Sequence, residues 1–423
     1  MRGRFWVETL GCPKNQVDSD KLAGSLLARG LVRASDSAEA DLVVVNTCAF
    51  IEEARAESVD TILALAEAGK DGAEIVVTGC LAERYGDELA RALPEVDAVV
   101  GIGVPVTIGR RPFGPVPRLD LLNLPRPPSP RPWAYVKVAE GCDRACGFCA
   151  IPSFRGPQRS RTLPQVLDEV DRLAVREVVL VAQDLAAYGR DQGRGQRAIV
   201  PLVEAVATRV ERVRLLYLYP ADLTDELVDA ICATGVPYFD LSLQHVSRPL
   251  LRRMRRWGDG DRFLTRIAAI RGRRSDAAFR SNFIVGYPGE TEDDHDQLLC
   301  FLEEARLDWC GFFPWSAEEG TYAAGLDGVV DPPLVGERLA ELTERQDAIT
   351  ATHRDALIGA EVEVLVDAPG VGRSHREAPE IDGVVHVPAH LRPGSVVPVT
   401  VTGAFGPDLV AAAVPAGPAG PAA

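Results

Sequence analysis

Residues 142–149 read Cys-Asp-Arg-Ala-Cys-Gly-Phe-Cys, a C-x3-C-x2-C spacing around which the rest of the chain can be interpreted. An apolar run at 134–138 precedes them and predicts a strand, so the three thiols share one strand-to-helix turn. Three thiolates on one loop can each bind one iron of a [4Fe–4S] cluster, whereas ordinary clusters use four. The fourth iron is then free to bind a small molecule, much as catalytic zinc keeps an open position. The stretch predicts a catalytic cluster on Cys142, Cys146 and Cys149.

A structural zinc site is the alternative for this loop. Closed tetrahedral zinc sites show four ligands, usually close in sequence. No fourth ligand follows near by, since the nearest downstream histidine is His245. The spacing therefore favours the cluster over zinc.

The loop opens a segment, 133–357, in which strand and helix patterns alternate. Six βα units are fewer than the eight of a closed barrel, so we expect a partial (β/α)6 barrel with its chemistry at the carboxyl ends of the strands. The expected strands are 134–138, 178–182, 214–218, 239–243, 279–285 and 310–315. The clearest expected helices are 163–174, 225–233, 291–305 and 337–357.

Upstream, residues 1–103 also alternate, which predicts an N-terminal parallel α/β domain. The expected strands are 5–9, 42–46, 75–78 and 98–100, with helices at 19–29, 54–68 and 85–92. Cys12, Cys48 and Cys80 each follow a strand, where the turns of a parallel sheet gather ligands. A single cysteine there is usually a packing residue. Three at equivalent turns, beside the 142–149 loop, predict a second metal site.

The remaining cysteines and segments are assigned as follows. Cys232, Cys300 and Cys310 lie in apolar stretches and are predicted to be core residues. Nine prolines mark 104–132 as a linker. Residues 358–414 predict a small antiparallel β-barrel of the oligonucleotide-binding type. Residues 415–423 predict a disordered tail.

Composition limits the class of protein. The chain has 423 residues, an ordinary hydrophobic fraction of 46%, and a net charge of −15. It shows no apolar run of membrane-spanning length and no signal peptide, so we expect a cytoplasmic protein with no membrane partner. Its nine cysteines are an odd number, which disfavours a disulfide framework. An acidic chain would need a local basic patch to bind nucleic acid.

Polar residues at the expected strand ends are candidates for binding a cofactor, although each could simply cap a loop. These candidates are Gln183, Asp184, Gln244, Arg280, Gly286 and Glu290. His245 is more often a structural donor than a catalyst. Arg155, Arg159 and Arg161 could grip a carboxylate or lie solvated on the surface. The run Arg252, Arg253, Arg255 and Arg256 predicts a basic helix face that is either solvated or in contact with RNA.

The loop, including Phe148 before its third cysteine, resembles the signature of the radical S-adenosylmethionine superfamily. With three cysteines on an upstream α/β domain, essentially the whole chain resembles the methylthiotransferase branch, which ends in a TRAM domain. Three stretches resemble the RimO family, which modifies a ribosomal protein, rather than the tRNA-modifying MiaB family. They are Gly11-Cys12-Pro13-Lys14-Asn15, Glu318-Glu319-Gly320-Thr321 and Ala378-Pro379-Glu380-Ile381-Asp382-Gly383.

This resemblance implies an enzyme that adds a methylthio group to the β-carbon of an aspartate in protein twelve of the small ribosomal subunit, free or on the ribosome. It implies two [4Fe–4S] clusters, two S-adenosylmethionine molecules per turnover, a sulfur donor and a low-potential electron donor. The implied cluster ligands are Cys142, Cys146 and Cys149 for radical generation, and Cys12, Cys48 and Cys80 for the sulfur. Bond formation at an unactivated carbon requires such a radical cofactor.

Two other functions stay open at this point. One is a tRNA-adenosine methylthiotransferase, which should carry a basic C-terminal barrel. From Glu361 to Asp408 the chain has seven acidic and three basic residues, which favours a basic protein substrate over a stable nucleic-acid contact. The other is a non-catalytic iron–sulfur or zinc protein that binds the ribosome, against which the open three-cysteine loop argues.

Overall fold

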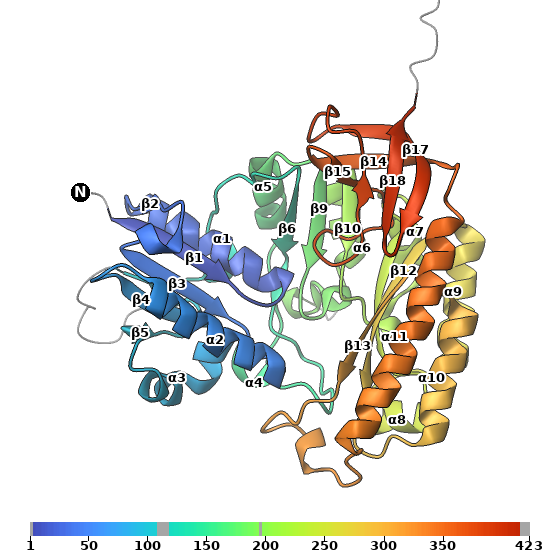
Figure 1. Ribbon diagram of the computed structural model, residues 1–423, viewed down its shortest axis with the longest axis horizontal. Helices are drawn as coiled ribbons and strands as arrows, with labels where there is room; N and C mark the ends of the chain where they lie inside the picture. Colours follow the sequence, from blue (N-terminus) through green and yellow to red (C-terminus); the bar gives the residue numbers. More distant parts are fainter. Residues whose placement is uncertain (1–2, 108–117, 194–196, 415–423) are drawn as a thin grey trace, which may run out of the picture.

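The structure is a computed structural model that describes residues 3–107, 118–193 and 197–414 (Figure 1). The tail predicted at 415–423 lies outside the described residues. So do Pro112, Pro115 and Pro117 of the predicted linker. Within the described part, none of the helices combines the length and apolar character that a bilayer span requires.

The N-terminal unit is built on a parallel sheet with the strand order β2-β1-β3-β4-β5. The strands are β1 (Arg4–Thr9), β2 (Val32–Arg33), β3 (Leu42–Thr47), β4 (Glu74–Gly79) and β5 (Ala98–Val99). Central β3 is buried at every residue, as expected for a parallel strand covered by helices on both faces. Four strands were predicted, but β2 has two exposed residues and too little pattern to detect.

Three helices flank this sheet, and each begins directly at a strand end or after a short turn. They are α1 (Pro13–Ala28), α2 (Glu52–Ala68) and α3 (Cys80–Ala92). The prediction began the first helix at residue 19. In fact Pro13 begins it, because the fixed φ of proline suits a first helical position, and Cys12 becomes the N-cap residue.

The central unit is an open arc of six parallel strands, which confirms the partial barrel. The strands are β6 (Trp133–Lys137), β9 (Glu177–Val181), β10 (Arg212–Leu215), β11 (Tyr238–Gln244), β12 (Ala278–Val285) and β13 (Trp309–Pro314). They form two three-stranded sheets, β6-β9-β10 and β11-β12-β13, joined by a bridge between Leu218 and Leu241. The arc stays open because no pairing joins β6 to β13 among the described residues.

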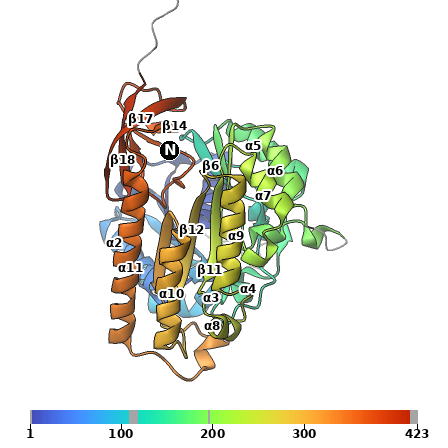
Figure 2. The ribbon, with the colours of Figure 1, turned by 90° about the vertical axis from the view of Figure 1, so that its right-hand side faces the viewer.

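Helices cover the outer face of this arc (Figures 1 and 2). They are α5 (Leu163–Leu173), α6 (Ile199–Ala207), α7 (Asp225–Cys232), α9 (Gly260–Arg273), α10 (Glu292–Ala305) and α11 (Pro332–Asp355). Two short helices, α4 (Ile151–Arg155) and α8 (Arg248–Arg253), and a small antiparallel pair, β7 (Ala139–Glu140) with β8 (Arg159–Ser160), lie around the cysteine loop. Capping boxes at Thr162 and Thr291 fix where α5 and α10 begin.

The inner face of the arc is filled by the other two units. Val17 of α1 and Ala378 of the C-terminal unit pack in one apolar cluster with Tyr135, Val181 and Leu216 of the barrel. The barrel core therefore depends on both neighbours, because an open arc exposes apolar surface that must be covered.

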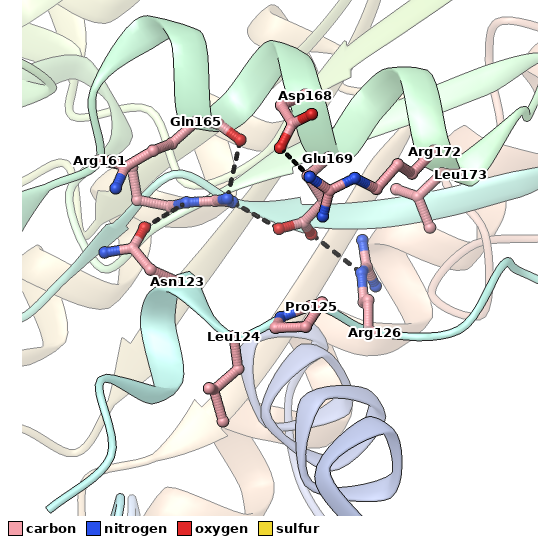
Figure 3. Close-up of a pocket in the computed structure, with 10 residues that line it drawn as sticks. All are labelled: Asn123, Leu124, Pro125, Arg126, Arg161, Gln165, Asp168, Glu169, Arg172 and Leu173. Atoms are coloured by element: carbon pink, nitrogen blue, oxygen red, sulfur yellow. Dashed lines mark hydrogen bonds and ion pairs between the residues drawn. The ribbon is translucent and has the colours of Figure 1, made fainter. Parts of the chain in front are cut away.

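The linker crosses the barrel surface and is anchored to α5 (Figure 3). Glu169 of α5 lies within ion-pair distance of Arg126, Arg161 and Lys21, at 2.9, 2.7 and 3.1 Å. All three cations are nearly buried. A charge shared in this way ties the linker, α1 and the barrel together at one place.

The C-terminal unit is a closed five-stranded barrel with the order β14-β15-β16-β18-β17. Its strands are β14 (Glu361–Ala368), β15 (Val371–Arg373), β16 (Val385–His386), β17 (Val396–Phe405) and β18 (Asp408–Ala413). The prediction of an antiparallel barrel needs one correction, because β16 and β18 pair in parallel. The sequence missed β15, whose three residues are too few to show alternation.

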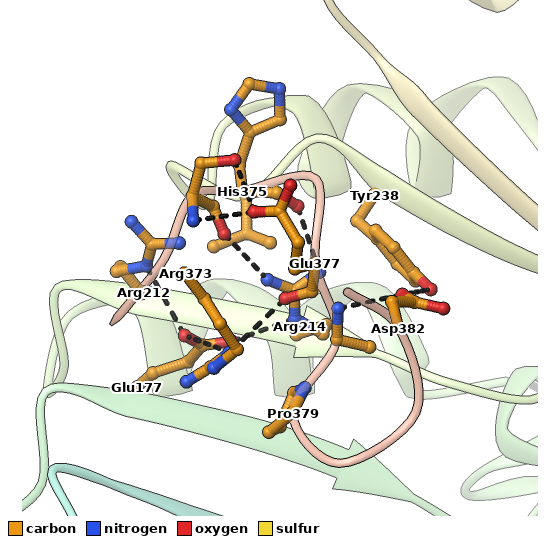
Figure 4. Close-up of polar contacts among 12 residues, drawn as sticks. Glu177, Arg212, Arg214, Tyr238, Arg373, His375, Glu377, Pro379 and Asp382 are labelled. Atoms are coloured by element: carbon orange, nitrogen blue, oxygen red, sulfur yellow. Dashed lines mark hydrogen bonds and ion pairs between the residues drawn. The ribbon is translucent and has the colours of Figure 1, made fainter. Parts of the chain in front are cut away.

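A loop of this unit, residues 374–382, plugs the amino-terminal end of the barrel strands (Figure 4). Glu177 at the start of β9 is fully buried and accepts from Arg214 at 2.8 Å and from Arg373 at 3.2 Å. Tyr135 donates to the carbonyl oxygen of Pro379 at 2.8 Å, and Tyr238 donates to Asp382 at 2.6 Å. The C-terminal barrel is thus fixed to the end of the arc opposite the carboxyl ends of its strands.

Candidate active site

The 142–149 loop leaves the carboxyl end of β6 through a turn that only glycine allows. Gly141 has φ +76°, and a Cβ there would lie 2.1 Å from the carbonyl oxygen of Pro157. The loop is then held from both ends, by Cys142 N donating to Gly156 O at 3.1 Å and Gly147 N donating to Met254 O at 2.8 Å. Its three thiols are partly accessible, so the loop presents them on one rigid turn.

Donors surround these thiols. The backbone N–H of Arg144 lies 3.4 Å from Cys142 Sγ, and Arg256 Nη1 lies 3.4 Å from Cys146 Sγ. Burial raises the pKa of Cys142 to about 11 and that of Cys149 to about 12. A metal binds cysteine as the thiolate, so it must displace the thiol protons. The N–H donors beside the sulfur atoms can then stabilise the negative charge of the thiolates.

The upstream cysteines converge because their three strands are neighbours in register. Thr9 of β1 pairs with Asn46 of β3, which pairs with Thr78 of β4, so the three following turns lie side by side. The Cβ position of Gly11 is only 2.8 Å from Cys48 Sγ, which shows how closely the first turn approaches the second cysteine. The expected convergence of Cys12, Cys48 and Cys80 follows from this sheet order.

Asn15 on the first turn of α1 organises this second site. Its Nδ2 donates to Leu10 O at 2.9 Å and to Thr47 O at 3.0 Å, which joins two of the three turns. Its Oδ1 lies 3.7 Å from Cys80 Sγ on the third. Burial raises the pKa of Cys48 to about 12. For Cys12, burial acts in the same direction, but Lys14 and the Asn15 N–H outweigh it and hold the pKa below its usual value.

Neither set of thiols is arranged for one metal ion. Among the described residues, no three Cys, His, Asp or Glu side chains form a group that could hold a single ion. In a [4Fe–4S] cluster each thiolate ligates a different iron, so the sulfur atoms stand farther apart than around one zinc. That each set of thiols binds a cluster stays a prediction, as does the preference for a cluster over zinc at the 142–149 loop.

Arg155 of the barrel reaches into the upstream site. Its Nη2 donates to Cys80 Sγ at 3.1 Å and to Asn15 Oδ1 at 2.8 Å, and its Nη1 contacts Asp18 and Glu140 at 2.9 and 3.0 Å. The guanidinium is nearly buried, with 3% of the side chain exposed. It lies six residues after Cys149, so a single side chain connects the loop of one cysteine set to the thiols of the other.

The three arginines after the cysteine loop therefore have separate roles. Arg155 binds Asp18 and Glu140 of this chain, whereas the prediction was a carboxylate of the substrate or of the cofactor. Arg159 is exposed and pairs with Asp120, and Arg161 is buried against Glu169 (Figure 3). The basic run at 252–256 does not form the predicted helix face, because α8 ends at Arg253 and Arg255 has a left-handed φ of +55°. Arg253 contacts Asp327, and Arg256 faces Cys146.

The predicted cofactor-binding residues lie at several depths of the barrel. Gln183 donates to Glu140 at 2.7 Å while its Oε1 is buried without a partner. Asp184 accepts from Arg144 at 2.5 Å, and its Oδ1 is also unpartnered. Gln244 ends β11 with φ +72°. These three side chains stand at the carboxyl ends of their strands, and the two orphaned oxygens are acceptors available to a bound molecule.

The other three candidates already have partners. Gly286 N donates to Glu290 Oε2 at 2.7 Å, and Glu290 pairs with Arg338 at 2.9 Å, which shapes the turn after β12. Arg280 is the third residue of β12, far from that end, and lies between Asp240 and Asp382 at 3.3 Å from each. Roles of these residues toward a cofactor stay predictions.

Some further expectations were altered by the structure. Cys310 and Cys232 are partly buried, but Cys300 is exposed, because α10 turns Leu298, Phe301 and Leu302 inward instead. The count of acidic and basic residues in the C-terminal barrel does not give the charge of its surface, because some of these residues are buried. Glu377 and Asp382 are buried against Arg354 and Arg280 of the barrel, and Arg373 is buried against Glu177. That this unit avoids nucleic acid stays a prediction.

Sequence reasoning missed the residues that join the units. Glu318 is buried and pairs at 2.5 Å with both Arg55 of α2 and Arg84 of α3, which ties the N-terminal unit to the loop after β13. Lys14 lies over the ring of Tyr217, with Nζ 3.5 Å from the ring centroid. Glu318 and Lys14 lie in two of the stretches that resemble the RimO family, and that resemblance was the one sign in the sequence that these residues matter.

Comparison with known proteins covers most of the chain. Residues 4–101 match the Uncharacterized protein family UPF0004, residues 136–302 the Radical SAM superfamily, and residues 358–414 the TRAM domain. A protein of Moorella thermoacetica, described as ribosomal protein uS12 methylthiotransferase RimO, is 45% identical over 94% of this chain and 96% of its own length. Proteins of the same description from Kineococcus radiotolerans and Sorangium cellulosum are 41% and 42% identical, over 95% of this chain and 96% and 89% of theirs.

Among solved structures, the cobalamin-dependent S-adenosylmethionine radical enzyme OxsB aligns with a TM-score of 0.48 at 12% identity, over 82% of this chain and 58% of that one.

Proposed function

The chain belongs to the RimO family of ribosomal protein uS12 methylthiotransferases, and we propose that it adds a methylthio group to the β-carbon of an aspartate of that ribosomal protein. It is a radical S-adenosylmethionine enzyme that uses iron–sulfur chemistry. The observation that carries the finer proposal is the pair of three-thiol sites joined by Arg155. We assign one [4Fe–4S] cluster to Cys142, Cys146 and Cys149, and a second to Cys12, Cys48 and Cys80.

When bound, the two clusters and S-adenosylmethionine supply the radical that removes hydrogen from the substrate carbon and the sulfur that replaces it. This chain's own residues supply position and a dry environment. The orphaned oxygens of Gln183 and Asp184 are available to accept hydrogen bonds from the amino and hydroxyl groups of the cofactor. Arg144, shared between Asp184 and Asp222, fixes the Asp184 side chain in that orientation.

Buried ion pairs between the barrel and α1 also fix the separation between the two cysteine sites. Lys137 at the end of β6 is fully buried and pairs with Asp18 of α1 and with Glu140. Arg155 pairs with the same two carboxylates, so two cations and two anions form one buried group between the sites. Such a group is costly to break when one member is removed, which suits a separation that must not vary during the reaction.

The proposal is tested with anaerobically reconstituted protein, S-adenosylmethionine, a low-potential reductant and recombinant uS12. Mass spectrometry should find a methylthio increment on one aspartate, together with 5′-deoxyadenosine. If 5′-deoxyadenosine forms while uS12 stays unmodified, the radical chemistry stands and the substrate is wrong. Bulk tRNA is then the next substrate, in line with the alternative of tRNA modification.

A further inference from the structure

Lys14 is a buried cation without a counter-ion. It lies on the first turn of α1, two residues after Cys12, and the residue is 9% exposed. Its Nζ lies 3.5 Å from the centroid of the Tyr217 ring. Within the part of the chain that the structure describes, this ammonium makes no hydrogen bond and no ion pair.

The neighbouring charges are already matched to one another. Lys137 and Arg155 share Asp18 and Glu140. Arg280, which interacts electrostatically with Tyr217, lies between Asp240 and Asp382. Among the described residues Lys14 therefore has no carboxylate partner, and the ionisable group that it acts on is the Cys12 thiol, whose pKa it lowers.

An unmatched buried charge is expensive, and proteins keep one mainly where a ligand supplies the partner. A cation over an aromatic face gains far less than it loses by leaving water, so Tyr217 does not replace an anion. Lysine also has three donors and no acceptor, so only an electron-rich group can satisfy it.

Tyr217 is itself held in an unusual backbone conformation. Its φ is +66°, a left-handed value that costs energy for a residue with a bulky side chain. The strained position is fixed by its N–H, which donates to Asp240 Oδ2 at 2.9 Å. The Tyr217 ring thus lies under the Lys14 ammonium on a strained backbone.

We propose that Lys14 binds the side-chain carboxylate of the substrate aspartate and so makes the enzyme selective for an acidic residue. The inference rests on the proposed function. The β-carbon that receives the sulfur is bonded directly to the carboxylate carbon, so a group beside the sulfur-bearing site is within reach of that carboxylate. Lys14, next to Cys12 and on the barrel side of α1, has this position and the matching charge.

Two other anions compete for the same ammonium. One is a cluster on Cys12, Cys48 and Cys80, which would carry negative charge itself. The other is the carboxylate of S-adenosylmethionine. The test must therefore vary the charge of the substrate separately from that of the enzyme.

The experiment is a double-mutant cycle on holoenzyme. Equilibrium binding of labelled uS12 is measured anaerobically for wild type and K14M, each against natural uS12 and a form with the modified aspartate replaced by asparagine. Wild type should prefer the natural protein about tenfold to a hundredfold, the range expected for a charge-assisted contact. K14M should bind both forms alike, at the affinity of wild type for the asparagine form.

Control variants separate this role from damage to the site. K14R keeps the charge and should retain most of the preference. K70M removes an exposed lysine that pairs with Asp41 on the surface, and should change nothing. The iron content of K14M, measured beside that of wild type, shows whether both clusters still load.

The outcomes are distinct. Equal binding of aspartate and asparagine forms by wild type overturns the inference, whether or not the variants fold. Preference retained in K14M overturns it too, and a changed cluster spectrum with unchanged preference assigns Lys14 to the cluster. Weaker S-adenosylmethionine binding with that preference unchanged assigns it to the cofactor. If wild type neither binds nor modifies uS12, the proposed function fails instead.

Discussion

The two three-cysteine sites of this enzyme are built in opposite ways. Cys142, Cys146 and Cys149 stand on one turn of eight residues, which Gly141 shapes and which is held by backbone hydrogen bonds to Gly156 near by and to Met254 after α8. Cys12, Cys48 and Cys80 come from three turns of a sheet and meet only because β1, β3 and β4 are neighbours. The first site is a property of a loop, whereas the second is a property of a fold.

This difference predicts different sensitivities. A local loop can form whenever its own residues are in place. A dispersed site also needs the residues that fix its turns and the barrel side chain that reaches it, which are Asn15 and Arg155. The upstream site should thus respond to changes at Asn15 and Arg155, whereas the loop should respond to its own residues and to the segment around Met254 that it contacts.

The largest expected effect separates the chemistry of the two sites. C142A should abolish both 5′-deoxyadenosine formation and the methylthio product, because it removes a ligand of the radical-generating cluster. C12A should abolish the methylthio product while 5′-deoxyadenosine still forms. Liquid chromatography of the nucleoside and mass spectrometry of uS12 measure the two products. Loss of 5′-deoxyadenosine in C12A would show that the sites are not separable.

E177Q should lower stability strongly without distinguishing the two sites, because Glu177 lies at the opposite end of the barrel. The change leaves Arg212, Arg214 and Arg373 without their shared carboxylate, and about 3–5 kcal/mol of unfolding free energy should be lost. Chemical denaturation at neutral pH measures it.

The pH dependence of that loss has a definite sign. The ordinary pKa of 4.5 falls to about 2 for Glu177 despite its burial, because Arg373, Arg214 and Arg212 favour the charged form. A depressed acid pKa contributes stability above pH 4.5 that is lost as the pH falls through 2. The difference between wild type and E177Q should therefore be constant above pH 5 and shrink below pH 4.5. A difference that grew in acid would contradict the ion-pair account.

R155M should affect the upstream site and spare the loop. Arg155 donates to Cys80 Sγ, and hydrogen bonds to cluster sulfurs raise reduction potentials. With Cys142, Cys146 and Cys149 all replaced by alanine to isolate the upstream cluster, R155M should shift its midpoint potential downward, by an amount on the order of tens of millivolts. Spectroelectrochemistry gives this value, and R155K, which keeps the charge, should shift it less. An unchanged potential would reduce Arg155 to a structural ion-pair partner.

These contrasts also explain what the sequence could predict. All six barrel strands were expected, because each of these strands of four to eight residues lies in or beside a mainly apolar run bounded by turn residues. The short strands β2 and β15 were missed, since two or three residues carry no periodicity. The cysteine ligands of the loop could be read from spacing alone. Those upstream required the sheet topology as well.

The contacts between units could not be predicted from the sequence, and the reason is physical. Glu318 pairs with arginines more than 230 positions away in the chain, and Asp382 with Arg280. Single charged residues in solvated-looking stretches give no signal of burial, because burial is decided by the packing of whole units. The charge count of the C-terminal barrel likewise included the buried Glu377, Asp382 and Arg373, although five acidic and two basic residues remain without them.

The smallest expected effect concerns how the two sites are held face to face. Glu318 joins the loop after β13 to α2 and α3, on the side of the N-terminal unit away from α1. E318Q keeps an acceptor oxygen but removes the charge, so about 1–3 kcal/mol of unfolding free energy should be lost. E341Q, at an exposed glutamate on α11, is the matched control and should change stability by less than about 1 kcal/mol. Because Lys137 and Arg155 hold the other side, both clusters should still load in E318Q, while methylthio product per 5′-deoxyadenosine should fall. If coupling is unchanged although stability drops, the separation of the two sites is fixed by the buried group around Arg155 alone.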